Sequence, residues 1–162
     1  MRRLSLSIVP MTRRHLAACD DIVRSSEPWK TLRERVDFLP FIRRKQAFAA
    51  VIEGAVAGFV LFTGEPVFAR GGYLRALAVA PAIRGSGVGR QLLAFAERTT
   101  ATKAPNFFLC VSSFNRRAQA FYRKSGYVRV GSIKGLIRRD REEIIYWKRL
   151  SKSGQRQKPQ HE

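Results

Sequence analysis

A chain of 162 residues, 45% of them hydrophobic, is long enough to form one domain with a buried core and too hydrophobic to be largely disordered. The longest uninterrupted apolar run, near residues 55–62, is far too short to cross a membrane, so no membrane partner is expected. The formal net charge of +19 favours acidic partners such as an acidic protein, nucleic acid, the ribosome surface or a multiply phosphorylated cofactor, although a general enrichment in arginine gives the same number.

The two cysteines and the N-terminal residues indicate the cellular compartment of the protein. Cys19 and Cys110 lie in apolar-patterned segments, as reduced, buried thiols do. Residues 4–10 alternate with serines and lack the hydrophobic core of a signal peptide. We therefore expect a cytoplasmic protein. No histidine or cysteine spacing fits a metal site, and no metal is expected.

The N-terminal part of the chain predicts a strand, two helices and a strand hairpin. Thr12 is a suitable N-cap for the first helix, and Pro28 disfavours helical geometry just before the second. Glu53-Gly54 separates two apolar segments and predicts a tight turn, while Gly58 predicts a bulge or a close backbone approach. The expected elements are a strand at 4–9, helices at 13–25 and 31–41, and strands at 46–52 and 55–63.

The rest of the chain alternates strands with helices and ends in a basic tail. We expect one domain over residues 1–150 and a disordered tail over 151–162. The order of elements predicts an α/β (α+β) domain with a central mixed sheet and helices on both faces. The expected segments are a loop at 64–72, a strand at 73–79, a loop at 84–90, a helix at 91–98, a strand at 107–112, a helix at 116–125, a strand at 127–133, a basic connection at 134–141 and a strand at 143–150.

A glycine-rich loop joins the strand at 73–79 to the helix at 91–98. Gly85, Gly87 and Gly89 leave several backbone N–H groups without partners at the positive end of the helix dipole. Such a unit binds an anion, usually a phosphate. A glycine turn without any ligand is the plainer alternative.

Two common phosphate-binding motifs do not fit this loop. A P-loop needs Gly-Lys-Ser/Thr, whereas Gly89 is followed by Arg90-Gln91. A dinucleotide-binding fingerprint needs a third glycine at the position of Arg90 and an acidic residue after the next strand, and the chain has neither. Both families are therefore excluded.

A third pattern, Arg/Gln-x-x-Gly-x-Gly/Ala after a strand that ends in Val-x-Pro, does fit. Its loop positions are filled by Arg84, Gly87 and Gly89, and the strand end by Val79 and Pro81. The segment resembles the pyrophosphate-binding loop of the GNAT superfamily of acyltransferases.

A second segment, about thirty residues later, resembles the same superfamily. Residues 115–127 read Asn-x-x-Ala-x-x-Phe-Tyr-x-x-x-Gly-Tyr, like the family's Asn-x-x-Ala-x-x-Phe/Leu-Tyr-x-x-x-Gly-Phe/Tyr. Two motifs in the right order are far more specific than either alone. The resemblance covers roughly residues 4–150, and residues 108–115 look like those of a subgroup of small prokaryotic members.

The resemblance implies the GNAT fold and acetyl-CoA as cofactor. The sheet is expected to be mostly antiparallel and to splay between residues 77–79 and 109–111, where the pantetheine arm would pair with the backbone like an added strand. Loop N–H groups would hold the pyrophosphate, with side-chain charge added by Arg84 and Arg90. The implied cofactor-binding residues are Leu77, Ala78, Val79, Arg84, Gly85, Ser86, Gly87, Val88, Gly89, Arg90, Asn115, Ala118 and Tyr122.

The same resemblance places Tyr122 near the thioester sulfur, where it would act as general acid. The resemblance does not identify the general base that would deprotonate the acceptor amine, because the strand at 73–79 carries no acidic residue. The candidates are Glu27, Glu65 and a water held by Ser112 or Ser113. The tentative acceptor-binding residues are Trp29, Glu27, Tyr73 and Ser112.

Two functions are consistent with these features. The first is an acetyl-CoA-dependent N-acetyltransferase, active as a monomer or homodimer, that transfers acetyl by direct attack to a primary amine of a protein, a peptide or an amino-acid-like molecule. The second is a non-catalytic module that binds acyl-CoA, nucleic acid or the ribosome, suggested by the missing strand acid and the charge of +19.

Overall fold

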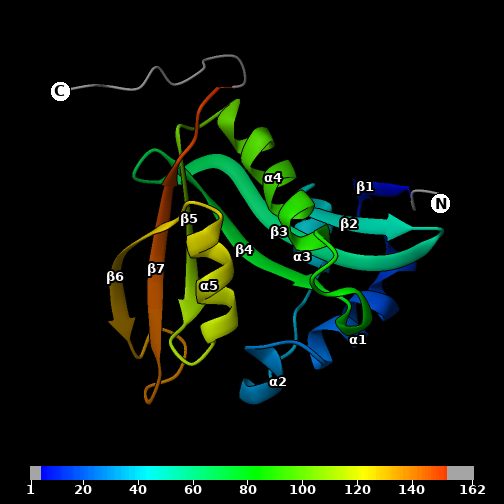
Figure 1. Ribbon diagram of the computed structural model, residues 1–162, viewed down its shortest axis with the longest axis horizontal. Helices are drawn as coiled ribbons and strands as arrows, with labels where there is room; N and C mark the ends of the chain where they lie inside the picture. Colours follow the sequence, from blue (N-terminus) through cyan, green and yellow to red (C-terminus); the bar gives the residue numbers. More distant parts are fainter. Residues whose placement is uncertain (1–4, 153–162) are drawn as a thin grey trace.

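A computed structural model describes residues 5–152 as a single seven-stranded sheet with helices packed on it (Figure 1). The strand order is β1-β2-β3-β4-β5-β7-β6, and every neighbouring pair is antiparallel except β4 and β5, which are parallel. The predicted mixed, mostly antiparallel sheet is therefore confirmed. The strands are β1 (Leu6–Pro10), β2 (Ala47–Ile52), β3 (Ala55–Phe68), β4 (Gly71–Val79), β5 (Asn106–Ser112), β6 (Val128–Lys134) and β7 (Glu142–Arg149).

Helices cover both faces of the sheet, as expected. A cluster of buried residues lies on each face: one packs under α4 and α5, and the other under α1 to α3. No helix within residues 5–152 is long and apolar enough to cross a membrane. The helices are α1 (Leu16–Arg24), α2 (Trp29–Leu32), α3 (Leu39–Arg43), α4 (Val88–Ala101) and α5 (Arg116–Lys124), with 3-10 turns η1 (Arg13–His15) and η2 (Pro81–Ile83).

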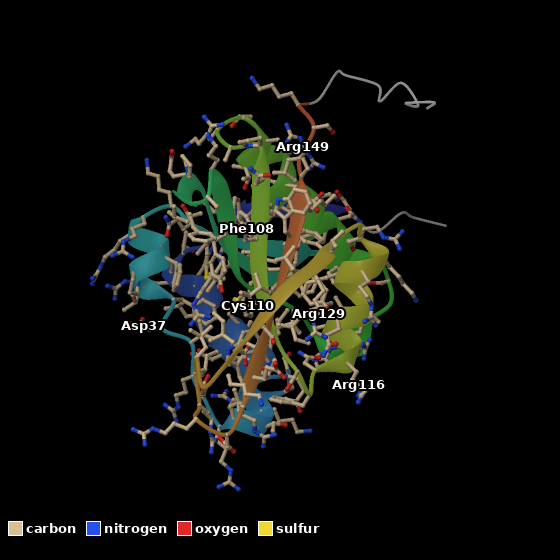
Figure 2. All side chains as sticks on the ribbon, turned by 90° about the vertical axis from the view of Figure 1, so that its left-hand side faces the viewer. Asp37, Phe108, Cys110, Arg116, Arg129 and Arg149 are labelled. Atoms are coloured by element: carbon tan, nitrogen blue, oxygen red, sulfur yellow. The ribbon has the colours of Figure 1, made fainter. Side chains whose placement is uncertain are left out.

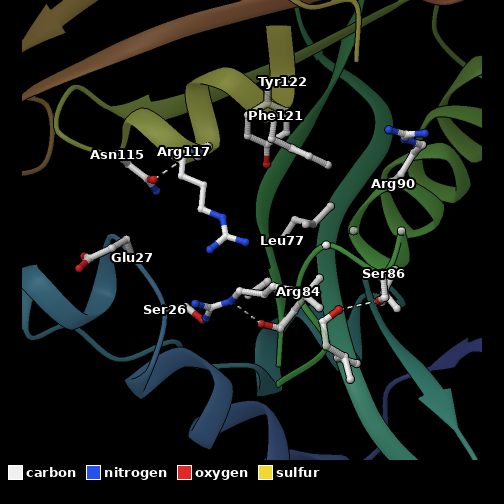
Figure 3. Close-up of a pocket in the computed structure, with 18 residues that line it drawn as sticks. Ser26, Glu27, Leu77, Arg84, Ser86, Arg90, Asn115, Arg117, Phe121 and Tyr122 are labelled. Atoms are coloured by element: carbon white, nitrogen blue, oxygen red, sulfur yellow. Dashed lines mark hydrogen bonds between the residues drawn. The ribbon is translucent and has the colours of Figure 1, made fainter. Parts of the chain in front are cut away.

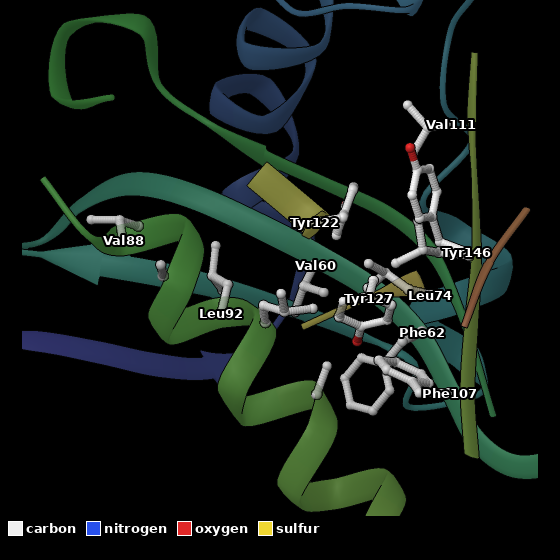
Figure 4. Packing of buried hydrophobic residues seen from close by; sticks show 14 of the residues in the cluster. Val60, Phe62, Leu74, Val88, Leu92, Phe107, Val111, Tyr122, Tyr127 and Tyr146 are labelled. Carbon is white, nitrogen blue, oxygen red and sulfur yellow. The ribbon is translucent and has the colours of Figure 1, made fainter. Parts of the chain in front are cut away.

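The larger core fixes α4 against the sheet. Leu92, Leu93 and Ala96 repeat at helical spacing and are buried, and the sheet side of the same core contains Phe62 and Phe107 (Figure 4). Burial of each such leucine or phenylalanine contributes about 1.5–3 kcal/mol to stability. The first turn of α4 is thereby held close to the end of β4.

The prediction of one helix at 31–41 is wrong, because the chain forms two short helices there, α2 and α3, instead. Arg33 adopts left-handed geometry (φ 53°) and ends α2, and the chain then runs without helix to Phe38. Pro40 lacks a backbone N–H and fits only the first turn of a helix, which is where it lies in α3. A carboxylate oxygen of Asp37 accepts a hydrogen bond from the N–H of Leu39 at the start of that helix.

The prediction of a loop at 64–72 is also wrong, because β3 continues to Phe68 and a two-residue turn leads directly into β4. The turn residues Ala69 and Arg70 both have positive φ, 44° and 59°, without a glycine at either position. The rings of Phe68 and Phe108 pack edge to face, 5.6 Å apart. Gly71 passes under the Phe108 ring so closely that a Cβ there would lie 2.4 Å from it. These tertiary contacts override the weak turn preferences of the two residues.

The turn at Glu53-Gly54 and the special role of Gly58 are confirmed. Both turn residues have positive φ, and they connect β2 directly to β3. The register of this hairpin shifts beside Gly58, and a Cβ on Gly58 would lie 2.6 Å from the carbonyl oxygen of Ala78. Gly58 therefore allows β3 to lie against the last part of β4.

The parallel strands β4 and β5 separate partway along their length, as the resemblance implied. They pair from Gly71 opposite Asn106 to Leu74 opposite Leu109, and no pair follows among the described residues. A register shift on the β3 side, between the partners of Leu74 and Ala76, accompanies the divergence. The remainder of β4 thus has one edge on β3 and the other open.

Candidate functional site

A pocket of about 730 Å³ lies between the end of β4, the loop before α4 and the first turns of α5 (Figure 3). Every residue that the sequence suggested for cofactor binding lines it. Five lining residues were not among those cofactor-binding residues: Ser26, Glu27, Ile83, Arg117 and Phe121. The two sequence motifs, separate along the chain, therefore meet in one cavity.

One wall of the pocket is a cradle of backbone N–H groups. Gly85 and Gly87 have φ of 84° and 93°, and Gly87 is the N-cap of the 14-residue helix α4. The first described backbone bond into the helix runs from the N–H of Gln91 to the carbonyl of Gly87, so the preceding three N–H groups point out of the helix end. A Cβ on Gly85 or Gly87 would meet no atom within 4 Å. This open, positively polarised loop fits a phosphate group.

The second wall is the open edge of β4. The N–H of Ala80 donates to the carbonyl of Ala57 on β3. Because backbone groups alternate in direction along a strand, those of Leu77 and Val79 point to the opposite side, into the opening. An extended amide chain can pair with this edge. The carbonyl of Val79 already accepts a hydrogen bond from Arg84.

Arg84 connects the loop to the segment after α1. Its guanidinium donates to the carbonyl of Val79 at 3.1 Å, to the carbonyl of Ser25 at 3.2 Å and to the hydroxyl of Ser26 at 2.9 Å. Burial and the nearby Arg117 lower its pKa. Three protein acceptors therefore hold the Arg84 side chain, while Arg117, which sequence reasoning missed, points into the pocket opposite it (Figure 3).

Asn115 and Tyr122 place polar atoms on the α5 side. The side-chain oxygen of Asn115 accepts the N–H of Ala118 at 3.2 Å and caps α5, which fixes the side-chain amide at the pocket wall. Tyr122 is only 7% exposed, yet its hydroxyl makes no hydrogen bond within residues 5–152 and points into the pocket (Figure 3). Burial, with a contribution from Tyr73, raises its pKa, so the phenol stays protonated at neutral pH.

The two carboxylates suggested as bases lie in different places. Glu27 is at the pocket rim, where its carboxylate accepts the N–H of Thr31 at 3.2 Å and the hydroxyl of Thr31 at 2.8 Å. Glu65 lies on β3 outside the pocket, exposed, and pairs with Lys103. The fold therefore brings only Glu27 to the cofactor side of the opening.

Of the four residues suggested for acceptor binding, Glu27 lines this pocket, and Trp29, Tyr73 and Ser112 lie outside it. Trp29 is 8% exposed and packs against Phe59 in the core under α1 to α3. Tyr73 and Ser112 are not among the pocket-lining residues. Because Leu109 and Val111 of β5 point into the core under α5, Ser112 faces the opposite side of the sheet.

That opposite face carries a second polar group, which includes Glu143 of β7. Glu143 pairs in register with Ser112, and the Ser112 hydroxyl donates to its carboxylate at 2.7 Å. Tyr73 and Cys110 lie beside it, and the pKa of Tyr73 is raised by burial, by Cys110 and by Glu143. Figure 2 shows this face, with Cys110 on β5. Sequence reasoning missed Glu143, whose only signal was an acidic residue at the start of an apolar strand.

Comparisons with known proteins agree with this geometry. The chain matches the model of the acetyltransferase (GNAT) family over residues 12–127. None of the curated protein sequences compared with it matches significantly. Similar solved structures include Ard1 from Thermoplasma volcanium (17% identity, TM-score 0.79, 92% of this chain and 100% of that chain), PaiA N-acetyltransferase from Thermoplasma acidophilum in complex with coenzyme A (20%, 0.73, 90% and 99%) and the ribosomal-protein-S18-alanine N-acetyltransferase of Escherichia coli (18%, 0.71, 95% and 99%). At these identities the likeness shows a shared fold.

Proposed function

Because the chain belongs to the acetyltransferase (GNAT) family, we propose that it is an acetyl-CoA-dependent N-acetyltransferase that acetylates a primary amine by direct attack in a ternary complex. One observation supports this most. A single pocket joins the glycine cradle before α4, the open edge of β4 and the free hydroxyl of Tyr122. These are the groups that a diphosphate, an extended amide arm and a leaving thiolate need, in that order along one ligand.

Acetyl-CoA is the cofactor of this family, and the pocket has the chemistry to hold it. The backbone cradle at Gly85–Gly89 suits the pyrophosphate, with Arg90 and Arg117 as nearby cations. The β4 edge at Leu77 offers backbone hydrogen bonds to the pantetheine amides. Since both interactions use mainly backbone atoms, they depend on strand and loop geometry more than on particular side chains.

In the proposed reaction the acceptor nitrogen bonds to the thioester carbonyl carbon and the carbon–sulfur bond breaks. In going from ammonium to amide the nitrogen gives up two protons, and the departing sulfur takes up one. We assign the donor role to Tyr122, whose raised pKa keeps it protonated and whose hydroxyl has no competing protein partner within the described chain. A proton released by the nitrogen restores the phenol.

We propose a protein or peptide amine, or an amino-acid-like amine, as the acceptor, in the cytoplasm. The net charge of +19 repels polyamines and attracts acidic peptides. The Escherichia coli neighbour is named for an alanine of a ribosomal protein, which is an acceptor of this kind. The thiols support a reducing compartment: both are free, Cys19 is buried and Cys110 is half-buried.

The test combines cofactor binding with turnover. Thermal unfolding is followed with increasing acetyl-CoA, and thiol release is then measured with a panel of primary amines and of peptides with free α-amino groups and acidic second to fourth residues. We expect a concentration-dependent rise in melting temperature and thiol release with part of the panel. A thermal shift without thiol release would instead support a non-catalytic acyl-CoA-binding module. The absence of both the thermal shift and thiol release would contradict the acetyltransferase and the acyl-CoA-binding module alike.

A further inference from the structure

We infer that Glu143, on the face of the sheet opposite the cofactor pocket, receives the ammonium of the acceptor and removes its proton. The inference rests on the proposed function and deepens it. It assigns the acceptor side of the opening to a primary ammonium group, and it names a proton acceptor that lies on β7 rather than on β4 or on the segment after α1.

The fold directs Glu143 to the splayed part of the sheet. It lies opposite Ser112, the last residue of β5, beyond the point at which β4 and β5 stop pairing. The next residue, Ile144, points into the core under α5, so Glu143 points to the other face. Its side chain is therefore one strand away from the opening into which Tyr122 points from the α5 side.

The carboxylate is buried and only half satisfied. Glu143 is 3% exposed and Ser112 2%, and the Ser112 hydroxyl donates to one carboxylate oxygen, Oε1. The second oxygen, Oε2, has no hydrogen-bond partner within residues 5–152 and is not fully buried, and no lysine or arginine of that range forms an ion pair with Glu143. A buried carboxylate without a cation is costly, and a bound ammonium would compensate it.

Titratable groups from three segments surround this carboxylate. Glu34, after α2, raises its pKa together with burial, while the Ser112 hydroxyl lowers it. Tyr73 and Cys110 lie next to it at the opening, with Arg75 close to both of them. Tyr73 and Cys110 are half-buried. In a chain of net charge +19, the negative charge of Glu34 is close enough to Glu143 to raise its pKa.

Tyr73 links the two sides of the opening. It influences the pKa of Tyr122, which faces the cofactor pocket, and is itself influenced by Glu143. Glu27, the alternative within the cofactor pocket, is exposed and already accepts two hydrogen bonds from Thr31. Glu143, largely buried and with one oxygen free of protein partners, is the better proton acceptor.

The ammonium passes one proton to Oε2 of Glu143, which becomes neutral, and the amine lone pair forms the bond to the thioester carbon. After carbon–sulfur cleavage, the thiolate takes the proton of Tyr122, and the second nitrogen proton restores Tyr122. Glu143 then loses its proton to solvent through the opening beside Tyr73 and Cys110.

The test compares Glu143→Gln with Glu142→Gln, a matched control on the same strand whose carboxylate accepts the hydroxyl of Ser132 instead. Thiol release is measured at pH 6.5 with the amine panel, whose members are largely protonated, and with methoxyamine, which is neutral at that pH. We expect E143Q to lower the rate with protonated amines about 100-fold and to change it little with methoxyamine, while E142Q resembles the wild type. Equal losses with both kinds of acceptor, or no loss, would overturn the inference.

A second measurement separates this inference from the proposed function. If the wild type releases no thiol, the proposed function fails, and Glu143 is tested directly by carbon-detected NMR of the CoA-bound protein, with E143Q identifying its carboxyl signal. We expect a carboxyl that titrates above the usual glutamate range and shifts when methylammonium chloride is added. A carboxyl that titrates normally and does not respond to methylammonium would contradict the ammonium site by itself.

Discussion

The two sides of the splayed opening, which we propose to bind the cofactor and the acceptor, are built from different parts of the chain. The cofactor side uses backbone: N–H groups at the start of α4 and the edge of β4, shaped by Gly85 and Gly87. The other side uses side chains of Tyr73, Cys110 and Glu143, brought together from three strands. A backbone site depends on few side chains beyond the glycines that shape it, so the acceptor can differ between proteins of this fold while the cofactor stays the same.

The largest effect is expected on the cofactor side. Gly87→Glu would put a carboxylate where the pyrophosphate is proposed to lie and should remove the acetyl-CoA thermal shift, which at 100 times the dissociation constant corresponds to about 2.7 kcal/mol. Gly54→Glu is the control, because Gly54 has a similar positive φ of 82° and open surroundings but lies in a distant turn. Loss of the shift in both variants would point to general destabilisation.

Tyr122→Phe tests the residue at the junction of the two sides. We expect the turnover number to fall about 100-fold while acetyl-CoA binding, measured by calorimetry, is kept, because only the proton donor is removed. Tyr146→Phe is a suitable control, since Tyr146 is buried in the same core but does not line the pocket. An unchanged turnover number for Tyr122→Phe would contradict this role and would indicate that solvent protonates the CoA thiolate.

Arg84 stabilises the cofactor side, since it ties the cofactor loop to the segment that carries Glu27. Arg84→Lys cannot reach Val79, Ser25 and Ser26 at once. We expect a loss of about 1–2 kcal/mol in the free energy of unfolding, measured by urea denaturation, and a higher KM for acetyl-CoA. Arg90→Lys, which changes an exposed arginine in the first turn of α4, should leave stability unchanged.

The acceptor side should show a pH-dependent stability. The folded state raises the pKa of Glu143, so its contribution to stability is present below the usual glutamate range and is lost as pH rises through the folded value. Glu143→Gln should therefore be more stable than the wild type at neutral pH, and the difference should vanish in acid. Urea denaturation at several pH values measures it, and a difference independent of pH would assign the gain to packing.

The smallest effect is expected away from both sides. Glu65→Gln removes an exposed ion pair with Lys103, worth less than about 1 kcal/mol, and should leave turnover unchanged. A large loss of activity in this variant would return Glu65 to the candidate bases and would show that the opening extends further along β3 than the structure indicates.

How far the sequence predicts these sides follows from the range of the contacts. The glycines of the cradle and the Asn115–Tyr122 segment are local patterns, and the structure brings them together in the pocket as expected. Glu143 meets Ser112 only through a strand register 31 residues apart in sequence, which no local pattern specifies. The turn at Ala69-Arg70 was missed for a similar reason, because Phe68 and Phe108 stabilise it from separate strands.

The position of β7 also sets the order in which the site can be completed during synthesis. β6 has only β7 as a neighbour in the sheet, yet β6 is made first. The cradle, the β4 edge and Tyr122 all precede residue 127 and can assemble while the last strand is still being synthesised. Glu143 arrives with that strand, which must enter between β5 and β6. A nascent chain that stops before β7 would thus contain the complete cofactor wall, together with Tyr73 and Cys110, but would lack Glu143.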